Sequence, residues 1–140
     1  MGHSFHKNFG HLIFHVGSVN IRADDLPRLH AYIRAIAKNN RVENIVIGGI
    51  GDHVHLLGDF PVNVALSVIV SKLKASSSYW VKGLHSYYST FAWQQGYGYF
   101  SVSASHRQRV AHYIRTQAEH HANMTAEEEY SLLMAKYEQC

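Results

Sequence analysis

The chain has 140 residues, of which 46% are hydrophobic and 16% charged, and this predicts one globular domain over residues 1–140 and excludes a disordered chain. Its apolar runs, such as residues 44–50, are too short to span a bilayer, and its single cysteine, Cys140, excludes an internal disulfide framework and a cysteine-based zinc cluster. We therefore expect a cytoplasmic protein without a membrane partner, whose net charge of +3 permits a polyanionic ligand but does not demand one.

The first half of the chain predicts a strand, a helix and a β-hairpin. Residues 11–16 mix apolar and histidine positions, as a strand does. A helix then begins at a cap provided by Asp24 or Asp25 and carries apolar residues at helical spacing as far as two asparagines. Residues 42–50 and 53–60 are β-rich and are separated by a turn signal, which predicts a hairpin.

The second half predicts a helix, a strand and two further helices. Asn63 is the expected cap of a helix that runs to about residue 84, and residues 99–103 form the fourth strand. A helix is predicted over residues 105–121, and Thr125 with Glu128 has the spacing of a capping box that begins a last helix. The order of elements is that of a split βαβ, ferredoxin-like α+β fold: an antiparallel sheet with helices on one face and extra C-terminal helices.

The histidines offer a candidate metal site. The chain has 12 of them, so about one His-x-His spacing is expected by chance. His53 and His55 lie in a predicted strand, where alternate side chains share a face about 6–7 Å apart. Two imidazoles at this spacing can bind one cation, and the neighbouring Asp52 can supply a carboxylate that orients them. The alternative is a pair of structural histidines.

The helix predicted over residues 105–121 carries a candidate nucleophile. Tyr113 and Gln117 lie four residues apart and share a face with Arg109 and His120. A phenol is a poor nucleophile until a cation or a base assists it. The amide oxygen of Gln117 is a hard ligand, which Mg2+ or Mn2+ accepts, and would complete a three-point site with the histidine pair. The alternative is a half-buried structural tyrosine, one of nine in the chain.

Several motifs occur in the order that one known family shows. The chain resembles the HUH-type single-tyrosine transposases of small insertion sequences, to which the REP-associated tyrosine transposases are related. The matching segments are GDHVHLL (51–57), SKLKASSS (71–78), WQQGYG (93–98) with FSVS (100–103), VAHYIRTQ (110–117) with His120-His121, and the EEY-x-x-L tail within 125–133. The chain departs from the family at Gly51, where a proline is usual, and in the loop after the first strand, where only Arg22 replaces a basic stretch.

The resemblance implies a fold, a reaction and a set of site residues. It implies a homodimer that cuts and rejoins single-stranded DNA at hairpin-flanked ends, with Mg2+ or Mn2+ and without ATP. Tyr113 would form a 5′-phosphotyrosine link and release a 3′-hydroxyl. His53, His55 and Gln117 would bind the metal. In such dimers the helix that carries the tyrosine often serves the partner's histidine pair, so the site is either composite or complete within one chain.

The residues also suggest DNA contacts and leave other functions open. Lys72, Lys74 and Arg109 are candidate phosphate contacts, and Trp93 is a candidate for stacking on unpaired bases. A HUH nickase of replication or plasmid transfer is a related alternative, although such proteins are usually larger. A decayed or domesticated transposase that binds single strands without cutting them is the second alternative. A hydrolase in which a metal-activated water attacks in place of Tyr113 is the third.

Overall fold

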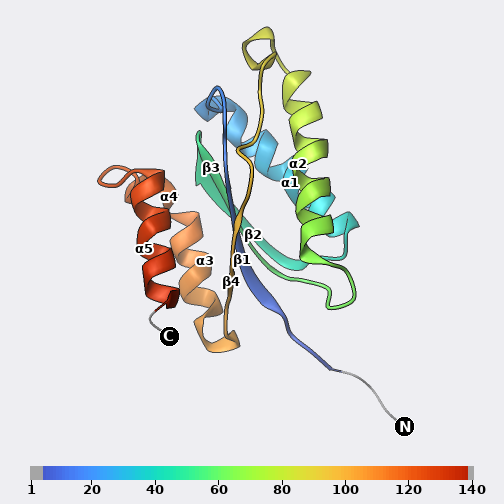
Figure 1. The fold of residues 1–140 in the computed structure, drawn as a ribbon, viewed down its shortest axis with the longest axis vertical. Coiled ribbons are helices and arrows are strands. Elements are labelled where there is room, and N and C mark those ends of the chain that lie inside the picture. Colours follow the sequence, from blue (N-terminus) through green and yellow to red (C-terminus); the bar gives the residue numbers. More distant parts are fainter. Residues whose placement is uncertain (1–4, 139–140) are drawn as a thin grey trace.

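Four antiparallel strands form one sheet in the computed structural model, which describes residues 5–138 (Figure 1). Across the sheet the strands are β2 (Glu43–Ile50), β3 (His53–Asp59), β1 (Phe9–His15) and β4 (Gly98–Ser101). The α+β architecture and the succession of strands and helices predicted from the sequence are confirmed, and the strand order is compatible with the ferredoxin-like pattern. Cys140 lies outside the described residues.

One face of the sheet is covered by α1 (Leu26–Asn39) and α2 (Leu66–Lys82), which lie together on the same side in Figure 1. The larger core lies between these helices and the sheet. Its buried members include Phe14 and Leu56 from the strands, Ile33 from α1 and Leu73 from α2. Burial of this apolar surface is the main driving force for folding.

The opposite face is covered by the C-terminal helices α3 (Arg107–Arg115), α4 (Gln117–His120) and α5 (Ala126–Glu138), drawn in orange and red in Figure 1. A smaller apolar cluster holds this layer and joins Leu57 and Val46 of the sheet to Ile114 of α3. Because side chains alternate along β3, Val54 and Leu56 point into the larger core, whereas His53 and His55 point under the C-terminal helices. The C-terminal helices therefore cover the histidine pair.

Three short 3-10 turns complete the described elements: η1 (Ala23–Asp25), η2 (Ser86–Tyr88) and η3 (Ala104–His106). None of the helices described over residues 5–138 has the length and apolar character needed to cross a membrane.

Two predictions about the helices were wrong: the cap of α2 and the continuity of the helix that carries Tyr113. Asn63 does not cap α2, because it lies in a turn and the helix begins at Leu66 after the extended residue Ala65. The helix predicted over 105–121 is interrupted at Thr116, where φ is −108° and ψ is 28°. The hydroxyl of Thr116 donates to the carbonyl of His112 at 2.9 Å, a side-chain bond that competes with regular helix geometry.

Candidate functional site

His53 and His55 lie side by side at the start of β3, and neither side chain is exposed. Their ring centroids are 4.8 Å apart. The pair therefore shares one face of the strand, as the alternation of the sequence predicted. Strand β3 lies inside the sheet between β2 and β1, so its backbone gives both rings a fixed base.

Each ring of the pair is held by a hydrogen bond on its Nδ1 side. Asp52 Oδ1 lies 2.7 Å from His53 Nδ1, so the acidic residue predicted to orient the pair does contact it. His11 Nε2, from β1, lies 2.7 Å from His55 Nδ1, and His11 is itself buried. Both bonds leave Nε2 facing the covering helices. Outer partners of this kind fix the ring orientation of metal-binding histidines.

Glu129 of α5 completes the cluster. In the sequence it stands in the EEY-x-x-L tail, and no role at the site was predicted for it. Its Oε1 atom lies 2.9 Å from His55 Nε2 and 3.4 Å from His53 Nε2. Glu129 is 2% exposed. His53, His55 and Glu129 therefore place two imidazole nitrogens and a carboxylate oxygen within 4.8 Å of one another, which is a donor set able to hold one cation.

The first turn of α5 fixes where this carboxylate lies. Glu128 N donates to Thr125 Oγ1 at 3.1 Å, and Thr125 N donates to Glu128 Oε1 at 3.4 Å, so the predicted capping box is present. Tyr130 anchors the next position, because a Cβ on Gly98 of β4 would lie only 2.5 Å from its ring. A glycine in the sheet thus lets α5 pack closely with Glu129 turned inward.

Tyr113 lies beside the histidine pair of its own chain. Its hydroxyl donates to Glu129 Oε2, and its ring centroid is 5.9 Å from that of His55. Helix α3 comes this close because the residue paired with His55 on β2 is Gly48, where a Cβ would lie 2.0 Å from the carbonyl oxygen of Ile114. Burial, together with the bond to Glu129, raises the pKa of the Tyr113 phenol, which keeps it protonated.

Gln117 meets only part of the cluster. Its Oε1 atom lies 2.9 Å from His53 Nε2 and 3.1 Å from His121 Nε2, while its Nε2 atom donates to the carbonyl of Tyr113 at 3.3 Å. The interruption at Thr116 therefore does not carry Gln117 away from the site. His121 Nε2 also lies 3.2 Å from Glu129 Oε1, so a third imidazole borders the cluster.

The ionisable groups of the cluster differ in charge near pH 7. Burial lowers the pKa of His11 to about 3 and that of His55 to about 4, so both are neutral near pH 7. Burial also lowers the pKa of His53, but hydrogen bonds with Asp52 and Glu129 raise it to about 9. Burial alone would raise the pKa of Glu129, yet hydrogen bonds with the histidine pair hold it well below its ordinary value. A buried carboxylate that stays ionised among imidazoles is suited to hold a cation.

The four candidate DNA contacts do not gather at this site. Lys72 is exposed on α2, on the opposite face of the sheet, and Arg109 is exposed on α3. The ammonium of Lys74 donates to the carbonyls of Gln94 and Gly96, at 2.8 and 2.6 Å, and so fixes the loop before β4. Trp93 packs on the larger core, and its indole N–H donates to Ser77. Their contacts with DNA stay predictions.

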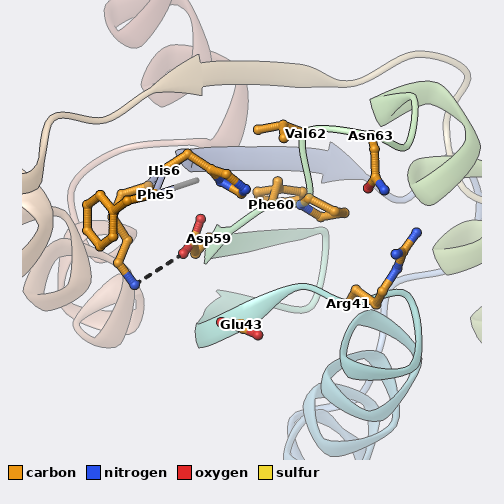
Figure 2. A pocket seen from close by; sticks show the side chains of 10 residues that line it. Phe5, His6, Arg41, Glu43, Asp59, Phe60, Val62 and Asn63 are labelled. Carbon is orange, nitrogen blue, oxygen red and sulfur yellow. Dashed lines mark ion pairs between the residues drawn. The ribbon is translucent and has the colours of Figure 1, made fainter. Parts of the chain in front are cut away.

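A cavity of about 350 Å3 lies near the cluster, on the side of His15. It is lined by residues 94–98, by Glu127 and Tyr130 of α5, and by His15, whose ring centroid is 5.7 Å from that of His53. A second cavity, of about 500 Å3, lies at the other end of β3, where Lys7 pairs with Asp59 at 3.6 Å (Figure 2). Because His53 begins the strand and Asp59 ends it, the second cavity is separate from the cluster.

Comparisons with known proteins agree with this picture of the fold. The IS200-like transposase family matches residues 5–117, which is more than half of the chain and includes His53, His55 and Tyr113 but stops before α5. A solved structure from Deinococcus radiodurans R1, described as that of a transposase, is 21% identical, with a TM-score of 0.63, and the alignment covers 81% of this chain and 94% of that one.

A second solved structure, of a REP-associated tyrosine transposase bound to a REP hairpin, is 13% identical with a TM-score of 0.54. The alignment covers 81% of this chain and 67% of that one. No curated protein matches the chain. At these identities the two structures establish the likeness of the fold.

Proposed function

The chain belongs to the IS200-like transposase family, and from this premise we propose that it is a metal-dependent transposase that cuts and rejoins single-stranded DNA through Tyr113. The observation that carries the proposal is that Glu129 links the Tyr113 hydroxyl to the histidine pair, because its Oε2 accepts from the hydroxyl and its Oε1 contacts His55 Nε2. A phenol, two imidazoles and a carboxylate in contact make up the parts of a nucleophilic phosphoryl-transfer site.

The residues present fit a divalent cation. His53 and His55 would hold it through Nε2, with an oxygen from Glu129 or Gln117 as a further ligand, and Asp52 and His11 would keep the rings oriented. Imidazole and oxygen donors together accept Mn2+ or Mg2+. A bound cation of this kind would polarise the phosphoryl oxygen and offset the charge that builds up during attack.

The chemistry at Tyr113 is an exchange of one phosphodiester for another. The phenolic oxygen attacks the scissile phosphorus, an O–P bond forms, and the bond from phosphorus to the 3′-oxygen breaks. The phenol loses its proton, and the departing 3′-oxygen gains one. The products are a 5′-phosphotyrosine and a free 3′-hydroxyl, which can reverse the reaction on a new strand. Because the phosphoester bond is conserved, the reaction needs no ATP.

Hairpin-bearing single-stranded DNA is the proposed substrate. The fold is similar to that of a REP-associated tyrosine transposase that was solved with a REP hairpin, which supports a hairpin at the DNA end. The cavity of about 350 Å3 beside His15 supports contact with an extended strand, because its aromatic and amide side chains can contact bases. Its lining also includes the carboxylate of Glu127.

The test is incubation of a labelled, hairpin-bearing single strand with the protein and Mn2+ or Mg2+, followed by denaturing electrophoresis. We expect a covalent protein–DNA band that is lost in Tyr113→Phe and kept in Tyr79→Phe, a matched change at a tyrosine that is 84% exposed on α2. Cleavage that persists in Tyr113→Phe would instead indicate a hydrolase. Binding of the wild-type protein without cleavage would indicate a non-catalytic module.

A further inference from the structure

We propose that Glu129 joins the two halves of the site: Oε1 is the main oxygen ligand of the cation, and Oε2 orients the Tyr113 hydroxyl. This inference rests on the proposed function. It assigns the role to α5, which lies beyond the segment that the family match covers, residues 5–117. It also makes Gln117 a weaker oxygen ligand than Glu129.

The contacts of Oε1 favour Glu129 over Gln117 as the ligand. Glu129 Oε1 approaches both rings of the pair, at 2.9 Å from His55 Nε2 and 3.4 Å from His53 Nε2. Gln117 Oε1 contacts only one of the two, His53. His121 Nε2 does not distinguish the two oxygens, because it lies 3.1 Å from Gln117 Oε1 and 3.2 Å from Glu129 Oε1. A carboxylate also carries the charge that an amide lacks, so it attracts a divalent cation more strongly in this buried setting.

The hydrogen bond to Glu129 Oε2 orients the hydroxyl of Tyr113. The phenol O–H already donates to Oε2, so one rotamer of Tyr113 is selected, and the oxygen that attacks is held beside the histidine pair. Holding the attacking oxygen in place matters for the rate, because a misplacement of about 1 Å at a reacting group can cost about 100-fold.

Of the three consecutive glutamates in α5, only Glu129 is buried. Glu129 is 2% exposed, whereas Glu127 and Glu128 of the same turn face solvent, the latter as part of the capping box. The capping box and the packing of Tyr130 on Gly98 set the rotation of α5, so only one of the three glutamates reaches the cluster. The run of acidic residues in the sequence therefore contains one functional member.

The first experiment measures metal binding without DNA. Titration of Mn2+, followed by the loss of its free electron paramagnetic resonance signal, is compared for the wild type, Glu129→Gln, Gln117→Ala and Glu127→Gln. We expect Glu129→Gln to weaken the affinity at least 10-fold, Gln117→Ala to weaken it less, and Glu127→Gln to leave it unchanged. A wild-type affinity in Glu129→Gln, or a larger loss in Gln117→Ala, would overturn the ligand assignment.

The second experiment measures the rate of the covalent adduct at saturating Mn2+, where a difference in affinity no longer matters. We expect Glu129→Gln to be about 100-fold slower, because the Tyr113 hydroxyl loses the carboxylate that orients it. A wild-type rate would overturn the role toward Tyr113. Glutamine has nearly the same volume as glutamate, and thermal unfolding of each variant checks that it folds. If Glu129→Gln does not fold, Glu129→Asp replaces it in both experiments. This variant keeps the charge but shortens the reach of the carboxylate to both partners. If the wild type forms no adduct at all, the proposed function fails, while the Mn2+ titration still decides the ligand.

Discussion

Gly48→Ala tests whether helix α3 must lie directly on the sheet for Tyr113 to act. A Cβ at this position would lie 2.0 Å from the carbonyl oxygen of Ile114, in the helix that carries Tyr113. An ordinary contact begins near 3.4 Å, so the helix has to retreat by about 1.4 Å. Backbone atoms make the contact, and no rotamer change can relieve it.

Two effects follow from this displacement. Overpacking of this kind costs about 1–3 kcal/mol of unfolding free energy. For a domain of this size, that lowers the unfolding temperature by about 3–10 °C. A misplacement of about 1 Å at the reacting group can lower the rate about 100-fold, so adduct formation should fall more than the loss of stability explains at 25 °C.

The assay combines thermal unfolding with the rate of adduct formation at 25 °C, where the variant is still folded. Gly83→Ala is the matched control, because its Cβ would meet its nearest atom, the carbonyl oxygen of Trp80, at 3.5 Å, which is an ordinary contact. The control should keep both values. A Gly48→Ala protein that unfolds at the wild-type temperature and cleaves at the wild-type rate would refute the reasoning.

Three further predictions follow from the cluster. His11→Phe should weaken Mn2+ affinity about 10- to 100-fold in a calorimetric titration, because His55 loses the partner of its Nδ1; an unchanged affinity would contradict this. Mn2+ should raise the unfolding temperature of the wild type and not that of the double variant His53→Ala/His55→Ala, and equal shifts in both proteins would place the cation elsewhere. In a chelator-treated sample, the unfolding temperature should fall from pH 7 to pH 5. The reason is that His11 and His55, with pKa values lowered by burial from 6.5 to about 3 and about 4, stay neutral in the fold while the unfolded chain takes up protons. An equal or higher unfolding temperature at pH 5 would argue against these shifts.

The histidine pair was predictable because its signal is local. Strand alternation alone places His53 and His55 opposite Val54 and Leu56, and the structure confirms both directions. The order of strands and helices was predictable for the same reason, since hydrophobic periodicity and turn signals act over a few residues. The capping box at Thr125 is a further local pattern that the structure contains.

The role of Glu129 was not predictable from such local patterns, although the EEY-x-x-L tail quoted for the resemblance contains this residue. It lies 74 residues from His55 in sequence, and only the packing of α5 on the sheet brings the two together. In the sequence it is one of three consecutive glutamates, which reads most simply as the acidic first turn of a helix. His11 is a similar case, because its partner comes from a neighbouring strand whose register the sequence does not state.

The interruption at Thr116 was missed for a different reason. Threonine is tolerated inside helices, and its bond to the carbonyl of His112 is one of several that the side chain can make. Periodicity therefore predicted a single helix.

The homodimer implied by the resemblance stays a prediction.

The contact between Tyr113 and the histidine pair of the same chain bears on stoichiometry. A site assembled within one polypeptide keeps its activity per molecule on dilution, and mixing a Tyr113→Phe chain with a His53→Ala chain should restore nothing. On the proposed mechanism, one tyrosine also holds one 5′ end at a time. A mobile element has two ends, so its excision would take two such chains acting together or one chain acting twice. Pairing of chains would then serve to synchronise two complete centres rather than to build one.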